Sequence, residues 1–205
     1  PACRLLDIHR TDRLHYLTAM QTNAFQGRRM YQKVMGEPCN SFANGDQTST
    51  MIRTVKGKTI LIQHNVMTPR PYSRMFQAVG TQGYAAKYPV AEVLLTAEAA
   101  AKVGIALDNS NVPLSASQIK TLLKHYAPAF SSEVINLAKQ LDPRGGMSYF
   151  MDLRLAQCLQ QGLPLDMDVY DLAEWCCIAE LSKRSIAHGS MPLMIPDFTR
   201  GAASV

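Results

Sequence analysis

The sequence contains no apolar run that approaches the roughly 20 residues of a membrane-spanning helix. Its first residues, PACRLLDIHR, lack the basic-then-apolar order of a signal peptide and do not begin with methionine. We therefore predict no membrane span in this chain. We also expect it to be a piece of a longer protein, and the location of that protein, bacterial-type cytoplasm or periplasm, stays open.

Nucleotide-binding and nucleophile motifs are also missing. The sequence has no G-x-G-x-x-G or G-x-x-x-x-G-K-[ST] phosphate loop and no G-x-S-x-G nucleophile elbow. The stretch GTQG, residues 80–83, joins two strand-like segments and is predicted to be a hairpin turn, not a phosphate loop.

Cysteine is scarce and irregularly placed, and charge is dispersed. No two cysteines form a C-x-x-C pair, and no His/Cys spacing suits zinc. The net charge of +5 is spread over the chain without a Lys/Arg-rich run. We predict no metal site and no nucleic-acid binding. We expect the cysteines to be small buried hydrophobic residues in a reducing compartment: Cys3, Cys39, Cys158, Cys176 and Cys177.

The first half of the chain reads as strands. Apolar residues make up 47% of the sequence, enough for a buried core, and residues 13–22 alternate as a strand does. Residues 48–54 and 59–67 form a hairpin around the turn VKGK, and a second hairpin turns at residues 80–83. Residues 91–96 add a further strand. Consecutive antiparallel strands predict a sheet with one buried face.

The second half has the period of helices, predicted over residues 115–127, 131–141, 145–162 and 166–189, with an earlier short helix over 23–36. Asp166 and Asp168 suit the start of the last helix as caps and as charges near its positive end. Two apolar stripes are predicted to face inward: Met151, Leu155, Cys158 and Leu159 in one helix, and Val169, Leu172, Ala173, Cys176 and Ala179 in the last.

Strands followed by helices predict an α+β fold. We expect an open, mostly antiparallel sheet with helices packed on one face, in a single domain over residues 1–205.

The stretch MTPRPYSR interrupts the predicted sheet. Pro69 and Pro71 fix the backbone and remove ladder donors, so Tyr72 is held with little freedom between Arg70 and Arg74. A positioned tyrosine hydroxyl can bind a sugar hydroxyl, and arginine supplies a rigid fork of donors. On residue chemistry alone, a stiff edge strand with an exposed tyrosine is an equal alternative.

Three histidines stand out less. His64, a polar residue in an apolar strand, is either a site residue or a hydrogen-bonded structural histidine. His9 and His15 have no partner nearby in the sequence, so we assign them surface or packing roles.

A family resemblance rests on four stretches: DIHRTDRLHYLTAMQT, GKTILIQHNVMTPRPYSRMFQAVGTQGYAAKYP, GGMSYFMDLRLAQCLQQGLPLDMDVYDLAEWCCIAELS and PDFTRG. In order and spacing they resemble the C-terminal domain of glycoside hydrolase family 109. These are α-N-acetylgalactosaminidase-type enzymes within the glucose–fructose oxidoreductase/inositol dehydrogenase superfamily. The resemblance covers the chain except residues 97–114 and the tip after Gly201.

The resemblance implies a parent protein with an N-terminal Rossmann domain that carries NAD. It implies redox-assisted cleavage of an N-acetylgalactosaminide, in which NAD transiently oxidises the sugar. It places the family's substrate tyrosine at Tyr72, and we add its neighbours Arg70, Arg74 and His64 as further candidate substrate-binding residues. Because the sheet face of such domains commonly packs against another subunit, it also implies a homo-oligomer.

The sequence departs from the family pattern in two respects. It lacks the Rossmann fingerprint and the Tyr-Pro-Thr-His-Gly segment that supplies substrate-contacting and proton-transfer groups. We therefore expect this chain to hold no catalytic and no cofactor-binding residue, to bind no NAD and to be inactive alone. Two alternatives stay open: the C-terminal domain of a sugar dehydrogenase, and a non-catalytic scaffold domain.

Overall fold

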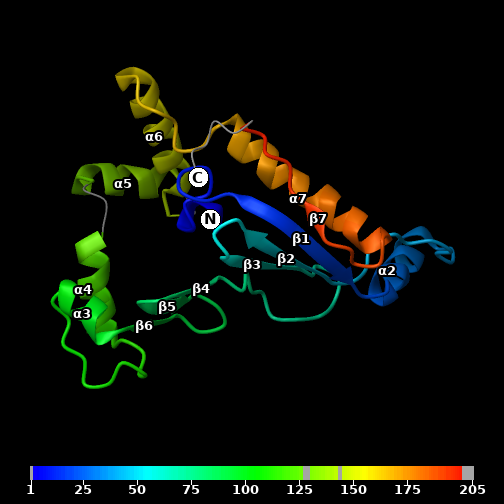
Figure 1. Ribbon diagram of the computed structural model, residues 1–205, viewed down its shortest axis with the longest axis horizontal. Helices are drawn as coiled ribbons and strands as arrows, with labels where there is room; N and C mark the ends of the chain where they lie inside the picture. The colour runs from blue at the N-terminus through cyan, green and yellow to red at the C-terminus, as the bar shows by residue number, and fades with distance from the viewer. Residues whose placement is uncertain (1, 127–129, 143–144, 200–205) are drawn as a thin grey trace. The chain divides into compact units, whose positions relative to one another are not determined.

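The computed structural model describes residues 2–126, 130–142 and 145–199 (Figure 1). The predicted helix end at Ala127 and the Arg200–Gly201 end of the PDFTRG stretch lie outside these residues. The chain divides into two compact units, Pro1–Arg70 with Pro164–Val205, and Pro71–Leu163. Each unit carries helices and an open antiparallel sheet, which confirms the predicted α+β class.

The sheet of the first unit has four antiparallel strands in the order β3-β2-β1-β7. These are β3 (Thr59–His64), β2 (Thr48–Thr54), β1 (Leu14–Gln21) and β7 (Leu193–Met194). The predicted hairpin is confirmed, and its second strand ends at His64, before the prolines. The two residues of β7 are too few for a pattern in the sequence to reveal them.

Helix α7 (Val169–Ala187) covers one face of this sheet (Figure 1). Leu17, Ile52 and Ile60 point toward it from three adjacent strands and form a buried core with Leu181 of the helix. Asp168 caps the helix as predicted, because its carboxylate accepts the N–H groups of Tyr170 and Asp171.

The inward face of α7 is not the predicted apolar stripe. Val169 and Leu172 are 67% and 56% exposed, and Cys176 is exposed as well. The buried positions of the helix are instead mostly polar: Asp171, Glu174, Leu181, Ser182 and Ser185. The prediction that the apolar stripe faces inward, and that Cys176 is buried, is therefore wrong.

Hydrogen bonds to the sheet explain why polar residues face inward. The Ser185 hydroxyl accepts the Ala19 N–H at 3.0 Å and donates to the Met191 carbonyl at 2.8 Å. The Ser182 and Thr50 hydroxyls lie 2.9 Å apart. The hydroxyls of Ser182 and Ser185 thus face the sheet with hydrogen-bond partners, which allows these polar side chains to be buried.

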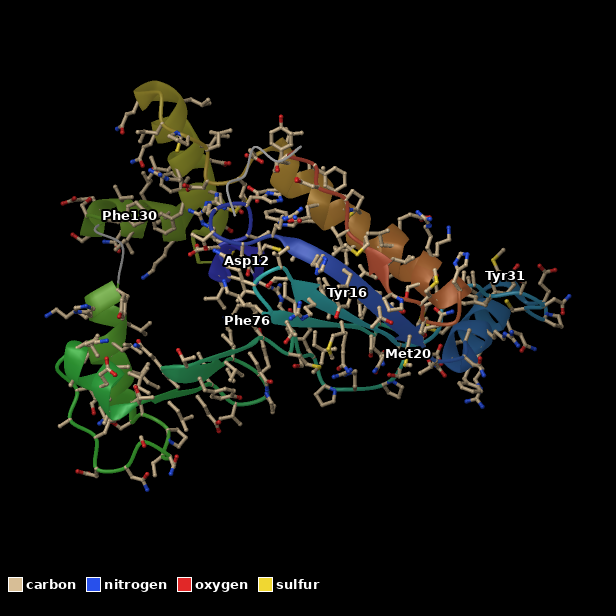
Figure 2. All side chains as sticks on the ribbon, in the orientation of Figure 1. Asp12, Tyr16, Met20, Tyr31, Phe76 and Phe130 are labelled. Atoms are coloured by element: carbon tan, nitrogen blue, oxygen red, sulfur yellow. The ribbon has the colours of Figure 1, made fainter. Side chains whose placement is uncertain are left out.

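A buried carboxylate joins the start of β1 to the β2–β3 hairpin. Asp12 is fully buried (Figure 2), and its two oxygens accept the N–H groups of Arg13 at 2.9 Å and Lys56 at 3.1 Å and the Thr54 hydroxyl at 2.8 Å. The Lys58 ammonium lies 3.4 Å away. Burial works to raise the pKa of Asp12, but these hydrogen bonds together hold it below its ordinary value.

We expect Asp12→Asn to destabilise the chain by about 3 kcal/mol at neutral pH, because an amide puts N–H groups against several donors. A lowered carboxylate pKa stabilises the fold above the ordinary aspartate value and loses that effect as the pH falls. The difference between wild type and variant should therefore shrink below about pH 4. Urea unfolding at a series of pH values measures it.

Asp7→Asn is the matched control, because Asp7 is exposed in the same loop and its left-handed backbone (φ 55°) suits asparagine. It should change stability by less than about 0.5 kcal/mol. An Asp12→Asn effect that is equally small, or that grows as the pH falls, would contradict the role of Asp12.

Two further helices belong to the first unit, α1 (Ala2–Leu5) and α2 (Phe25–Met35). The start of α2 is capped from a distant loop, since the Asp46 carboxylate accepts the N–H groups of its first three residues at 2.8–3.0 Å. The helix ends at Gly36, as predicted, in a left-handed conformation (φ 76°) that glycine adopts without strain.

Within its described residues, the second unit holds a three-stranded antiparallel sheet and four helices. The strands are β4 (Gln77–Gly80), β5 (Gly83–Ala86) and β6 (Glu92–Leu95). The helices are α3 (Ala97–Lys102), α4 (Ala116–Tyr126), α5 (Ser132–Leu141) and α6 (Met147–Gln161). The predicted hairpin at residues 80–83 is confirmed. A small buried core packs against Val93 and Leu95 of β6 and consists of Ala100, Val103, Ile105 and Leu114.

Helix α6 also differs from its prediction. Cys158 is buried, but Met151, Leu155 and Leu159 of the expected inward stripe are exposed. Glycine is required just before this helix, because a Cβ on Gly146 would lie 2.7 Å from the Cβ of Ala138 in α5. The close approach of α5 and α6 thus depends on that glycine.

Among the described residues, no helix combines the length and the apolar character needed to cross a membrane.

Candidate functional site

Tyr72 stands on an irregular segment that leads into β4. Its side chain is 71% exposed. The Lys87 N–H donates to the Phe76 carbonyl at 2.9 Å, which extends the β4–β5 ladder by one pair beyond Gln77 and Ala86. The ends of this hairpin therefore run side by side, and they carry Tyr72 and Tyr88.

Two side chains hold the Tyr72 ring and hydroxyl. The Arg74 Nε–H donates to the Tyr72 hydroxyl oxygen at 2.6 Å. The Tyr88 ring meets the Tyr72 ring edge to face, with the ring centres 5.9 Å apart and an angle of 86° between the planes. The hydrogen bond to Tyr72 raises the pKa of Arg74 above its ordinary value, so the guanidinium is charged.

The backbone just after Arg74 has an uncommon conformation at one residue. Met75 has a left-handed φ of 43°, which is uncommon for a residue with a long side chain, and its N–H bonds the Ser73 hydroxyl at 3.0 Å. Arg74 reaches back to the hydroxyl of Tyr72, two residues earlier. The arrangement is local, since residues 72–88 supply all of it.

The hydrogen bond decides what Tyr72 can offer a ligand. A phenol hydroxyl has one donor and acceptor lone pairs. Arg74 occupies one lone pair, so the Tyr72 proton is directed away from the guanidinium. The exposed hydroxyl is thus able to donate to an oxygen of a bound molecule.

Of the four predicted site residues, Tyr72 and Arg74 are brought together. Arg70 and His64 belong to the first unit, and both are exposed. His64 is the last residue of β3, where it pairs with Thr48 of β2. Their roles stay predictions.

A buried cluster in the first unit was missed by sequence reasoning. His9, which we assigned a surface or packing role without a partner, lies between two carboxylates of α7. Its Nδ1 is 3.4 Å from Asp171 Oδ1, and its Nε2 is 3.0 Å from Glu174 Oε2. No short-range pattern could reveal this cluster, because the histidine and the carboxylates come from opposite ends of the chain.

The chemistry of this cluster is that of a closed structural contact. Burial raises the pKa of Glu174, against the attraction of His9. Burial raises the pKa of Cys3, and the pKa of Cys177 to about 11, with the charge of Glu174 adding to both. These two thiols are therefore protonated at neutral pH and are poor nucleophiles. The cluster fastens the N-terminal loop to α7.

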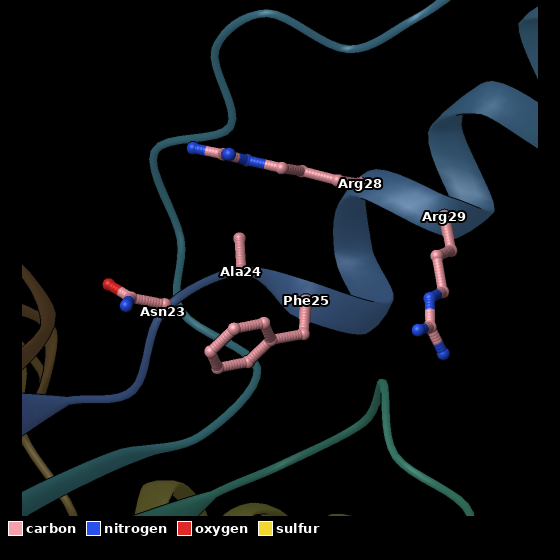
Figure 3. Close-up of a pocket in the computed structure, with 5 residues that line it drawn as sticks. All are labelled: Asn23, Ala24, Phe25, Arg28 and Arg29. Atoms are coloured by element: carbon pink, nitrogen blue, oxygen red, sulfur yellow. The ribbon is translucent and has the colours of Figure 1, made fainter.

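A surface pocket of about 340 Å³ lies at the start of α2 (Figure 3). Asn23, Ala24, Phe25, Arg28 and Arg29 line it. A helix start with two arginines suits an anion, but here the first N–H groups of the helix are already bonded to Asp46. The pocket therefore lacks the backbone donors of such a site.

In the part of the chain that the structure describes, no three His, Cys, Asp or Glu side chains lie close enough to hold a metal ion.

Comparison with known families identifies the family of the chain. The family model described as "Glycosyl hydrolase 109, C-terminal domain" matches residues 1–204. The chain belongs to glycosyl hydrolase family 109. This agrees with the resemblance that the sequence motifs carry.

Relatives of the family 109 domain are similar over its whole length. It is 53% identical to "Glycosyl hydrolase family 109 protein 1" of Bacteroides fragilis and 54% identical to "Glycosyl hydrolase family 109 protein" of Porphyromonas gingivalis. Each alignment covers 98% of the family 109 domain but 44% of the relative. A third, "Glycosyl hydrolase family 109 protein 5" of Phocaeicola vulgatus, is 46% identical over 100% of the domain and 40% of its own length. The domain thus spans less than half of these relatives.

Proposed function

We propose that this chain is the substrate-contacting C-terminal domain of a glycoside hydrolase that cleaves N-acetylgalactosaminides with the help of NAD. Family membership supports a glycosidase, and the exposed, oriented Tyr72 hydroxyl supports contact with a sugar. In this proposal Tyr72 binds the sugar, and residues outside this chain supply proton transfer.

NAD does not fit the residues present here. A dinucleotide site needs a glycine-rich turn between a strand and a helix, whose N–H groups hold the pyrophosphate. Among the described residues, the glycine pair of residues 80–83 closes a β-hairpin, and the first N–H groups of α2 are bonded to Asp46. We therefore assign NAD binding to the part of the parent protein outside this chain.

This assignment predicts that the chain alone has neither NAD affinity nor glycosidase activity. Calorimetric titration of the chain with NAD should show no binding at micromolar concentrations, and aryl N-acetylgalactosaminides should not be cleaved. The parent protein, titrated in parallel, is the positive control. Micromolar NAD binding to the chain alone would contradict the assignment.

Tyr72→Phe in the parent protein tests the sugar contact. It should lower kcat/KM, and the loss of transition-state stabilisation calculated from the ratio of the two values should be about 1–2 kcal/mol. This is the value of one lost hydrogen bond to substrate. Steady-state kinetics with an aryl N-acetylgalactosaminide measures the loss.

Tyr84→Phe is the matched control, since it removes a hydroxyl from β5 of the same unit. Its kcat/KM should stay within about twofold of wild type. If Tyr72→Phe is equally silent, Tyr72 is only an exposed residue of a stiff segment.

We also propose that the chain self-associates through the open face of its first sheet. The strand register puts Met51, Leu61 and Met20 on the face opposite α7, and Met20 and Leu61 are 67% and 54% exposed. Met194 of β7 pairs with Tyr16 and lies on the same face; Figure 2 labels Tyr16 and Met20 of this face. This patch of apolar side chains has a member on each of the four strands, interspersed with Thr18, Ser49 and Arg53, and exposed apolar side chains grouped on one face are typical of a protein contact.

Met51→Glu tests this contact, because it places a charge at the centre of the patch. We expect wild type to sediment as an oligomer and the variant to shift to the mass of one chain. Val79→Glu is the control, since Val79 is 82% exposed on β4, outside this sheet. A wild-type chain that stays monomeric at high concentration would refute the proposal.

A further inference from the structure

The contact between Arg74 and Tyr72 has a geometry that a loop anchor would not need. Arginine most often anchors a loop through a carboxylate or a backbone carbonyl, which are strong acceptors. Here the Arg74 Nε–H instead donates to the hydroxyl of Tyr72, at the short distance of 2.6 Å, and Tyr72 is 71% exposed. The bond orients an exposed functional group and buries nothing.

We propose that Arg74 is a positioning residue, which holds the Tyr72 hydroxyl as a hydrogen-bond donor toward an acceptor oxygen of the bound sugar. This inference rests on the proposed function, since it assumes that Tyr72 contacts the sugar. It adds the direction of the hydrogen bond and the residue that sets it.

The direction follows from the lone pairs of the phenol oxygen. A free tyrosine hydroxyl rotates about its C–O bond and can donate to, or accept from, a sugar hydroxyl. An N–H donor in contact with the oxygen excludes the rotamer that points the proton at Arg74. The proton is therefore left to meet the ligand, and a sugar group that it meets acts as acceptor.

The ring is fixed by a second contact, so the donor has one position as well as one direction. Tyr88 packs edge to face on Tyr72 and limits rotation of the ring. Tyr88 reaches this place through the β4–β5 ladder and its extension by the Lys87–Phe76 hydrogen bond. Position and direction are fixed before a ligand arrives, which lowers the entropy lost on binding.

A double-mutant cycle in the parent protein tests the positioning role. Tyr72→Phe and Arg74→Met should each lower kcat/KM by about 5- to 30-fold, the equivalent of 1–2 kcal/mol. In the Tyr72→Phe background, Arg74→Met should cost no more than about twofold, because Arg74 then has no hydroxyl to orient. Arg74→Lys, which keeps the charge and a donor, should recover part of the single-variant loss.

Lys124→Met is the matched control, because it removes an exposed cation from α4 of the same unit. It should leave kcat/KM unchanged, and thermal unfolding of every variant shows that the fold is retained. If the losses from Tyr72→Phe and Arg74→Met multiply in the double variant, Arg74 acts independently of Tyr72 and the inference is overturned.

Substrate analogues test the direction of the bond. The test uses N-acetylgalactosamine analogues in which each ring hydroxyl is replaced in turn by hydrogen or by fluorine. Fluorine accepts a hydrogen bond weakly but cannot donate one. The inhibition constants of the deoxy and fluoro analogues are compared at each position. At the position that Tyr72 contacts, the fluoro analogue should bind wild type about threefold more tightly than the deoxy analogue. Tyr72→Phe should remove that preference. Equal binding of the two analogues to wild type at every position would show that Tyr72 does not donate.

These outcomes separate the inference from the proposed function. Parent protein that neither binds nor cleaves the sugar would overturn both. A large effect of Tyr72→Phe with no coupling to Arg74 would leave the sugar contact standing and overturn the positioning role alone.

Discussion

The first unit depends on one buried carboxylate. Asp12 accepts hydrogen bonds from Arg13, the residue before β1, from Thr54 at the end of β2 and from Lys56 in the β2–β3 turn. Since an unpaired buried charge is costly, all of these donors must be in place for the carboxylate to be buried at all. The Lys58 ammonium, which also donates to the Leu6 carbonyl, extends the same network to the N-terminal loop. The position of β1 against β2 and the path of the loop before it are therefore fixed together.

Local patterns predicted local structure well. Alternation located β1 and the two hairpins, and the capping residue Asp168 marked the start of α7, because these signals depend on residues within a few positions of one another. The orientation of α7 could not be predicted in this way. Its buried face is chosen by hydroxyl partners on strands that are distant in the sequence, and apolar periodicity carries no information about them.

The same distinction applies to the candidate site. Two prolines in the sequence marked Tyr72 as a residue held in place, and Arg74 was within reach by its position in the chain. That the two side chains bond directly depends on the backbone from Tyr72 to Arg74 and on the side-chain torsions, which no residue pattern indicated. The contact of His9 with Glu174 of α7 could not be predicted either, because the two residues are distant in the sequence and meet only in the tertiary fold.

The serines on the inner face of α7 have a consequence for the rotation of that helix. Ser182 and Ser185 attach to Thr50 and Ala19, which are themselves a directly opposed pair on β2 and β1. Aliphatic contacts allow a helix to roll or slide by a fraction of a turn at little cost, whereas hydrogen bonds depend on angle and distance. Two such bonds to one cross-strand pair fix both the axial position and the roll of α7. The helix therefore cannot roll to bury Val169, Leu172 and Cys176, and their outward orientation follows from the two hydrogen bonds on its inner face.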